Sequence, residues 1–259
     1  MNKSLTILTI FAALLLSCTE HDEDENSFSS EADGPEKMSV RYAALPKITN
    51  LDPKLNYEFS YNQGNLTKIS GKIKTFAGFD VFLIEPNSIL SYNNNLVTVE
   101  NSEIADNNIK RIIYTMEKGR PKKAELYDGN NLLFSKKDYF YEADKIVVSE
   151  KMYTWEFYTT YFFDSHKNLI KAEKLEKSGG IDKKLTTTMY LDFDHSKNPY
   201  KKLYLANDNF YEKSLSENNY RKIAYTVKDL QNTQFPPGYG NAEWTYSYNS
   251  DGQIILYFQ

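Results

Sequence analysis

The sequence predicts an all-β fold: a large antiparallel meander of hairpins, curled or barrel-like, after a disordered N-terminal tether. Three observations support this fold class. Aromatic and polar residues alternate on both sides of short turns rich in Asn, Asp and Gly, as in half-buried strands joined by tight hairpins. Aromatic residues, which favour strands, make up 15% of the chain. We also find no long segment with convincing helical periodicity.

The first element is an export segment. Lys3 precedes an apolar stretch, residues 5–16, that is too short to cross a bilayer, which needs about 20 apolar residues. Its length is typical of the core of a secretion signal. Ser17, a small residue, then precedes Cys18, the single cysteine of the chain. We therefore expect residues 1–17 to be a signal peptide.

The segment Leu15-Leu16-Ser17-Cys18 resembles the lipobox of bacterial lipoproteins. In that family the cysteine thiol receives a diacylglycerol and the signal is removed just before it. The resemblance implies an acylated Cys18, with membrane lipid as its partner and the outer membrane as its location. Each buried methylene contributes about 0.8 kcal/mol, so several acyl chains anchor a protein stably. The alternative is an ordinary signal peptide that happens to contain a cysteine.

An acidic run follows the cysteine. It resembles the acidic export signal of Bacteroidetes-type surface lipoproteins, and its members are Glu20, Asp22, Glu23, Asp24 and Glu25. The resemblance implies display on the cell exterior. The alternative is a solvated linker on the periplasmic face, since runs of like charge are usually disordered. Residues 18–40 contain few large apolar groups, so we expect them to form a disordered tether.

The charge balance differs between the tether and the body. The chain has 35 acidic and 31 basic residues, but residues 18–36 hold eight of the acids and no Lys or Arg. The body that follows therefore has a net charge of about +3. Such a weak charge gives no electrostatic reason to expect nucleic-acid binding. We expect residues 41–259 to form one all-β, repeat-like domain without disulfides.

Hairpins recur along this body. The clearest lie on either side of the turns at residues 62–65 and 249–252. Weaker copies begin at Tyr92, Tyr127, Tyr141, Phe163 and Phe193. With these turns we expect roughly 13 to 16 strands in a meander that curls or closes to protect its edges. The segment Ser102–Met116 is predicted to be a turn and a strand.

The repeated turn also resembles the YD repeat of RHS-type proteins, whose units read tyrosine-aspartate, a short turn and Gly-Asn-Leu. Tyr61–Leu66 and Tyr127–Leu132 match it best. The resemblance covers about residues 55–259 and implies a domain of degenerate hairpin repeats. The copies are unevenly spaced and lack the regularity of true RHS shells, which argues against a closed RHS cocoon.

Two turns contain residues that are able to bind a metal ion. Asp164 and His166 lie in one turn, and Asp194 and His195 lie in the equivalent turn of a neighbouring hairpin. A zinc or calcium site requires that the two turns meet. The simpler interpretation is that these residues only build exposed turns, because the sequence has no recognisable metal-binding motif. We therefore expect no cofactor.

Aromatic side chains provide the better candidate for a ligand site. Tyr239 lies in the Pro- and Gly-rich segment 235–241, which we expect to be a long loop that exposes the ring. Trp244 follows this loop, and Trp155 lies in a strand with aromatic residues on both faces. Aromatic planes beside Asn and Asp suit sugar rings. The alternative for each ring is a place in the core.

The sequence favours a non-enzymatic protein. It has no Gly-x-Ser-x-Gly nucleophile elbow and only three His residues. The leading interpretation is a lipid-anchored, surface-exposed outer-membrane protein that binds a glycan, a peptide or a partner protein. The alternatives are a structural subunit that docks on an outer-membrane transporter or secretion machine, and a hydrolase whose site has no sequence signature.

Replacing Cys18 with Ala tests the anchor. The variant should lose both a radiolabelled palmitate and its place in the membrane fraction, because the acylated thiol is absent. Retention of label and membrane association by Cys18→Ala would contradict the lipoprotein assignment.

Overall fold

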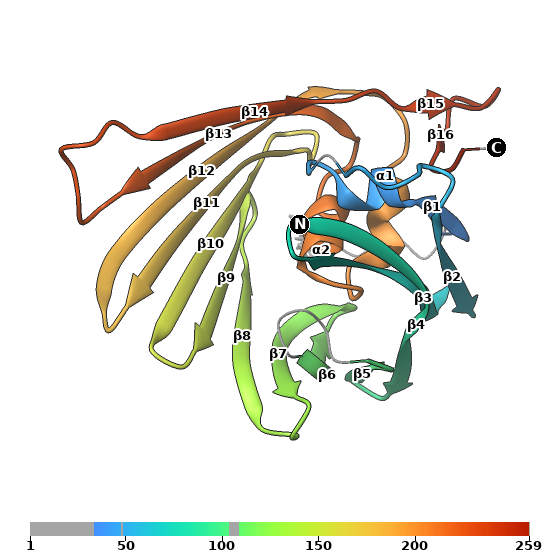
Figure 1. Ribbon diagram of the computed structural model, residues 1–259, viewed down its shortest axis with the longest axis horizontal. Helices are drawn as coiled ribbons and strands as arrows, with labels where there is room; N and C mark the ends of the chain where they lie inside the picture. Colours follow the sequence, from blue (N-terminus) through green and yellow to red (C-terminus); the bar gives the residue numbers. More distant parts are fainter. Residues whose placement is uncertain (1–33, 48, 104–108, 259) are drawn as a thin grey trace, which may run out of the picture.

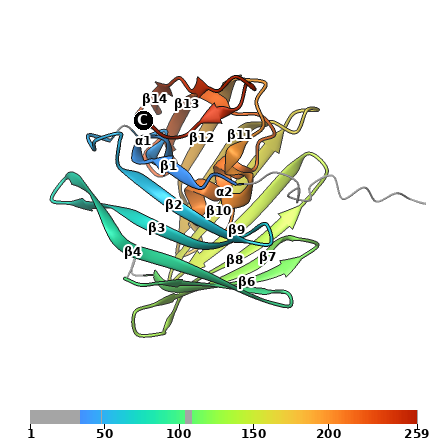
Figure 2. The ribbon, with the colours of Figure 1, turned by 90° about the vertical axis from the view of Figure 1, so that its right-hand side faces the viewer.

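The computed structural model describes residues 34–47, 49–103 and 109–258. Its main element is a fourteen-stranded antiparallel sheet in which each strand pairs with the next one along the chain. Figures 1 and 2 show this sheet curling around the helical segments. The predicted antiparallel meander is therefore confirmed, and β1 and β14 form the two edges of the curled sheet.

Sixteen strands are present in the described part of the chain, within the expected range. They are β1 (Lys37–Ser39), β2 (Asn56–Asn62), β3 (Asn65–Phe76), β4 (Phe79–Asn93), β5 (Leu96–Asn101), β6 (Ile109–Glu117), β7 (Arg120–Asp128), β8 (Leu133–Tyr141), β9 (Lys145–Met152), β10 (Trp155–Phe163), β11 (Leu169–Ser178), β12 (Ile181–Phe193), β13 (Tyr220–Asp229), β14 (Gly238–Glu243), β15 (Ser247–Tyr248) and β16 (Ile254–Ile255). The last two form the hairpin predicted at the C-terminus, and this hairpin is a two-stranded sheet separate from the main one.

The helical segments are short. They are α1 (Val40–Ala44), the 3-10 helix η1 (Pro199–Leu203) and α2 (Asp208–Ser214). The strand predicted within Ser102–Met116 is β6. The turn predicted before it falls partly on residues 104–108, which lie outside the described residues.

Alternation along the strands separates an inner from an outer face. In β7, Ala124 and Leu126 are buried inside the curl. Between them, the Glu125 side chain reaches the outer face and pairs with Lys136 of β8 at 3.1 Å. This period of two is the reason that the sequence pattern identifies strands.

Three of the recurring turns have one geometry, and they begin at Asp128, Asp164 and Asn249. In each, the side-chain oxygen of the first residue accepts the backbone N–H groups of the second and fourth residues after it. The third residue after it adopts a left-handed conformation, with φ of 61°, 62° and 73°. Asx side chains stabilise such turns by replacing backbone partners, which explains the repeated sequence pattern.

A fourth copy, at Asp194, begins in the same way but does not return as a strand. Its carboxylate accepts the N–H of Ser196 at 3.1 Å. Asn198 then accepts the N–H of Tyr200 at 2.9 Å and so caps η1, with Pro199 at the helix start. Pro at the first turn and Asn at the N-cap are strong helix-start signals. The chain therefore leaves the sheet and forms a helical insertion, residues 199–219, between β12 and β13.

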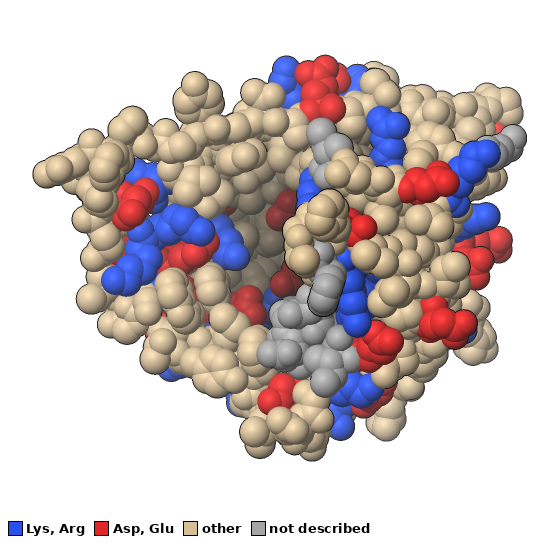
Figure 3. Space-filling model, in the orientation of Figure 1, with Lys and Arg blue, Asp and Glu red and all other residues tan. Residues whose placement is uncertain are grey.

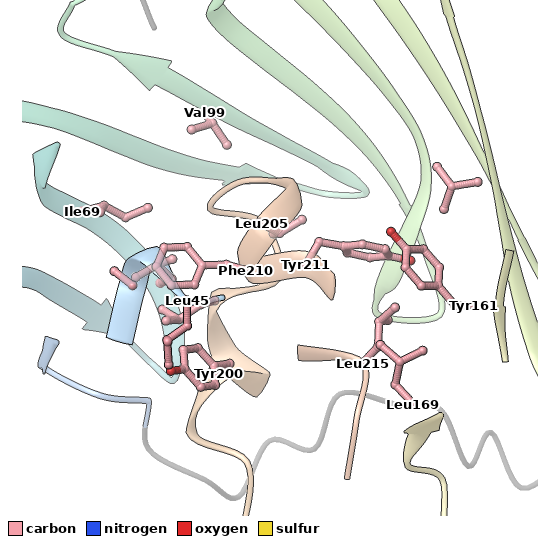
Figure 4. Close-up of a cluster of buried hydrophobic side chains, with 14 of the residues drawn as sticks. Leu45, Ile69, Val99, Tyr161, Leu169, Tyr200, Leu205, Phe210, Tyr211 and Leu215 are labelled. Carbon is pink, nitrogen blue, oxygen red and sulfur yellow. The ribbon is translucent and has the colours of Figure 1, made fainter. Parts of the chain in front are cut away.

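This insertion fills part of the curl. The ring of Phe210 lies 6.1 Å from that of Phe59 on β2. The ring of Tyr211 lies 5.4 Å from that of Tyr139 and 6.1 Å from that of Tyr161. Figure 4 shows Phe210 and Tyr211 extending from the helical segment, with Tyr211 directed towards Tyr161 on the strand side. Burial of each large side chain contributes about 1.5–3 kcal/mol, so the insertion is a major part of the core.

Polar groups hold the ends of the insertion. The Asn198 amide donates to the carbonyl of Ser216 at 2.8 Å. Both the backbone N–H and the side-chain amide of Asn219 donate to the buried carboxylate of Asp194 at 3.1 Å. The Tyr248 hydroxyl donates to the other oxygen of Asp194 at 3.0 Å. The fourth turn, the exit of the insertion and the C-terminal hairpin therefore meet at one carboxylate.

The folded body begins earlier than the sequence predicts. Met38 of β1 and Val40 of α1 are fully buried, and β1 pairs with β2. The tether therefore does not extend to residue 40, because these apolar side chains belong to the core.

A buried lysine joins the N-terminal segment to the insertion. The ammonium of Lys213 donates to the carbonyls of Tyr42 at 3.0 Å and Ala43 at 3.1 Å, at the end of α1. It also lies 5.1 Å from the centre of the Tyr200 ring. Burial lowers the pKa of Lys213 to about 7.

Removal of the Asp194 carboxylate should destabilise the whole domain. We expect Asp194→Ala to lower the free energy of unfolding by about 3 kcal/mol, because the buried donors of Asn219 and the partly exposed hydroxyl of Tyr248 lose their acceptor. Chemical denaturation measures this. Asp182→Ala, which removes an exposed ion pair with Lys177, is the control and should change stability little. Equal effects of the two variants would contradict the role of Asp194.

Candidate functional site

The insertion covers only part of the inner face and leaves a hollow of about 350 Å³ between the strands β8–β12 and α2. Figure 3 shows this face hollowed, with acidic side chains inside it. We call this space the inner hollow. It is lined by the charged residues Lys137, Glu150, Lys174, Asp208 and Glu212, the hydroxyl residues Thr159, Thr186 and Thr188, the aromatic residues Tyr139, Phe157, Tyr161 and Tyr211, and Val148, Ala172 and Asn209.

An ion pair lies where the sheet meets the helix. The ammonium of Lys137, on the inner face of β8, lies 2.6 Å from each carboxylate oxygen of Asp208, the first residue of α2. Glu150 lies 3.5 Å from the same ammonium and accepts a hydrogen bond from Ser135 at 2.7 Å. The Lys137 side chain is almost fully buried, and these two carboxylates compensate its charge.

The pair shifts both pKa values. Burial alone would raise the pKa of Asp208, but the charge and hydrogen bonds of Lys137 lower it below the ordinary value. Burial likewise acts to lower the pKa of Lys137, and Asp208 and Glu150 reverse this effect. The Asp208 side chain is 76% exposed, because it faces the open hollow. Water therefore screens the ion pair and limits its contribution to stability.

Glu212 has the opposite shift from Asp208. It follows Asp208 by four residues in α2, so both carboxyls lie on one side of the helix and line the hollow. Burial raises the pKa of Glu212, although the nearby Tyr190 hydroxyl and the charge of Lys213 oppose this shift. The hollow therefore holds two carboxyls whose pKa values are shifted in opposite directions.

Aromatic rings form another part of the site. Phe157 lines the hollow, and Lys174 lies 4.7 Å from its ring centre. The ring of Trp155, two residues earlier on the same face of β10, lies nearly parallel to that of Phe157 at 6.2 Å. Trp155 is 38% exposed, so it offers an accessible ring beside the hollow.

The three aromatic residues predicted to bind a ligand do not lie together. Only Trp155 lies beside the inner hollow. Tyr239 is 87% exposed as expected, but it belongs to the edge strand β14 and pairs with Thr226 instead of lying on a loop. Trp244 is buried against Tyr220 at 5.8 Å, which corrects the expectation that it flanks an exposed surface. Its backbone N–H still donates to the carbonyl of Arg221 on β13 at 2.9 Å, and Ala242, two residues earlier, packs against the core, so alternation places the Trp244 ring on the inner side.

The turns predicted to hold a metal ion have structural roles. Asp164 accepts hydrogen bonds within its own turn, and Asp194 anchors the insertion. Neither His166 nor His195 joins them in a cluster, and the described residues contain no group of three or more His, Cys, Asp or Glu side chains that could hold a metal ion. The metal site remains a prediction without a geometric basis.

The predicted lipidation site, Cys18, and the acidic export signal, residues 20–25, lie outside the described residues. The longest described helix has seven residues, and none of the described helices could span a membrane.

Sequence reasoning missed the charged residues of the hollow. Ser135, Lys137 and Tyr139 occupy alternate positions of β8, all on the buried face. A lysine is unusual at such a position, and this could have marked Lys137 as a candidate. Asn207-Asp208 is a recognisable helix N-cap followed by an acid in the first turn. Neither signal reveals that the two residues meet, because 71 positions separate them.

No family model matches the sequence, and no curated protein is significantly similar to it. Solved structures that are similar to this chain include two porin-like proteins. A porin-like protein from Bacteroides vulgatus ATCC 8482 has a TM-score of 0.54 and 11% sequence identity, over 86% of this chain and 91% of that one. A porin-like protein from Bacteroides uniformis ATCC 8492 has a TM-score of 0.48 and 13% identity, over 77% of this chain and 80% of that one. The first of these shares the fold of this chain.

Because the pKa of Glu212 is raised, we expect Glu212→Gln to increase the stability of the protein at high pH but not at low pH. The folded state holds this proton more tightly than the unfolded state, so the wild type loses stability as the pH rises from about 4.3 through the folded pKa. The variant does not, and should melt a few degrees higher at pH 8 but not at pH 4. Glu173→Gln, on the outer face, is the control for thermal melts at both pH values. A pH-independent effect of Glu212→Gln would contradict the burial argument.

Proposed function

We propose that this protein is a lipid-anchored outer-membrane protein that binds a glycan in the inner hollow. The hollow carries the proposal: its volume lies within the roughly 300–1,000 Å³ typical of small-molecule sites. It contains carboxylates, ammonium groups and hydroxyls, and the accessible indole ring of Trp155 lies beside it. Sugars need this combination, because their C–H faces pack on aromatic rings while their hydroxyl groups both donate and accept hydrogen bonds.

The location rests on different observations. The lipobox-like segment that ends at Cys18 supports a lipid anchor, and the acidic run after it supports display on the cell exterior. The fold shared with a porin-like protein of Bacteroides vulgatus is compatible with an outer-membrane role.

The outer face of the sheet is suited to water. Several of its aromatic side chains lie against cations, as Phe162 does at 4.0 Å from Lys171 and Tyr127 at 4.8 Å from Arg111. Such cation–aromatic pairs and the ion pairs beside them favour a hydrated surface. The lipid anchor, and not the outer face of the sheet, would therefore hold the body at the membrane.

Glycoside hydrolysis is the second candidate function. It is favoured by one observation: Asp208 and Glu212 line the same hollow and have pKa values shifted in opposite directions. Glycosidases use two carboxyls whose environments separate an acid from a base or nucleophile.

A matched pair of variants on β10 tests glycan binding. Trp155 and Tyr158 are 38% and 37% exposed, but they lie on opposite faces of the strand. In titrations against a panel of purified oligosaccharides, Trp155→Ala should weaken binding at least tenfold, a loss of about 1.4 kcal/mol, whereas Tyr158→Ala should have no effect.

The same panel separates binding from hydrolysis. Sugars recovered intact after prolonged incubation indicate a binding protein. New reducing ends that disappear in Asp208→Asn and Glu212→Gln indicate a hydrolase. If no oligosaccharide binds, or if both β10 variants bind as the wild type does, the glycan proposal is wrong.

A further inference from the structure

Apolar side chains protrude from one rim of the sheet. The turns that join β7 to β8, β9 to β10, β11 to β12 and β13 to β14 follow one another from the bottom to the upper left of Figure 1. At or beside these turns, Leu132, Tyr153, Ile181 and Phe235 are 64%, 69%, 52% and 69% exposed. We call these four residues the apolar rim.

The opposite ends of the strands are different. The turns there include Gln63-Gly64, Asn94-Asn95, Lys118-Gly119, residues 142–144, which read Glu-Ala-Asp, and residues 164–168, which read Asp-Ser-His-Lys-Asn. These are ordinary polar turn residues. Hairpin turns therefore do not require exposed apolar groups in this fold, and their presence on one rim needs a separate explanation.

Tyr153 occupies a position that its backbone disfavours. Its φ is +54°, a left-handed conformation that Gly and Asn adopt more readily than an aromatic residue. Among the described residues with positive φ it is the only aromatic one. The ring is supported at 5.6 Å by Phe134 of the neighbouring hairpin. Local strain at an exposed turn is a reason to look for function.

We propose that the apolar rim inserts into the interfacial region of a lipid bilayer. Successive hairpins are about 9–10 Å apart, since neighbouring strands are separated by 4.7–4.9 Å. A row of separate protruding side chains suits fluid lipid, whereas a protein interface requires a closely packed core. Aromatic and aliphatic side chains in this arrangement are typical of interfacial anchoring.

The charged residues near the apolar rim are suited to a lipid bilayer with anionic headgroups. Lys151 and Lys228 are exposed close to the turns and can approach lipid phosphates. Nearby acids already have partners, since Asp182 pairs with Lys177 at 3.0 Å and Asp229 accepts backbone N–H groups of its own turn. Insertion of the rim would also bring Trp155, two residues from Tyr153, to the bilayer surface.

Tyr153→Asn gives the sharpest test, because Asn suits the left-handed backbone and should preserve or improve folding. Every variant is made in the full chain with Cys18→Ser, so that no acyl chain contributes. Co-sedimentation with vesicles of phosphatidylethanolamine and phosphatidylglycerol should show at least threefold weaker binding for Tyr153→Asn. Serine at all four rim positions should weaken it at least tenfold.

Four exposed apolar residues of the outer face provide the matched control. Serine at Ile89, Phe140, Met189 and Leu191 should change vesicle binding less than twofold. A second measurement uses vesicles with brominated acyl chains, which should quench the fluorescence of Trp155 but not that of the buried Trp244. This quenching should be lost in Trp155→Phe.

Several results would overturn the proposal. The proposal is wrong if Tyr153→Asn and the four-serine variant both fold and sediment with vesicles as the parent chain does. It is also wrong if brominated lipids do not quench Trp155. A change of oligomeric state in the rim variants with unchanged vesicle binding would identify a protein interface and reject the lipid surface.

Discussion

The fold depends on covering the inner face of an open curled sheet. A sheet with two free edges cannot bury its inner side chains by closing on itself, so another element must occupy the curl. The helical insertion between β12 and β13 does this, with Phe210 and Tyr211 packed against strands that are distant in sequence. Its position is fixed by polar contacts at its ends, among which the Asp194 carboxylate joins three segments.

These polar contacts are buried, and for this reason they fix the position of the insertion. A buried carboxylate or amide is tolerated only when its hydrogen bonds are made, so the Asp194 and Asn198 networks admit one arrangement of the insertion. Lys213 fixes the N-terminal segment in the same way, because its buried ammonium donates hydrogen bonds to carbonyls at the end of α1. Burial lowers its pKa to about 7, so this contact involves a group close to its titration at neutral pH.

The inner hollow is a consequence of incomplete coverage. The insertion is too short to meet the inner face of β8–β12 along its full length, and water reaches the space that remains. Charged side chains are tolerated at this boundary because they pair across it, as Lys137 and Asp208 do. The same geometry places polar groups in the cavity and the accessible ring of Trp155 beside it, which is the basis of the proposed glycan site.

The sequence by itself determined the strands, the hairpin turns and the meander. These features depend on contacts between near neighbours: alternation sets the two faces of each strand, and Asp128, Asp164 and Asn249 close their own turns through backbone N–H groups. It also indicated Trp155 as a candidate ring, but could not separate it from the buried Trp244.

Only the tertiary structure decided the rest. The turn at Asp194 resembles the other copies in sequence, yet it leads into a helical insertion, because Asn198 and Pro199 start η1 and the open curl needs a filling element. The hollow joins Lys137 to Asp208 across 71 positions. No local pattern encodes that contact, since it depends on how strongly the sheet curls and on which inner positions the insertion leaves uncovered.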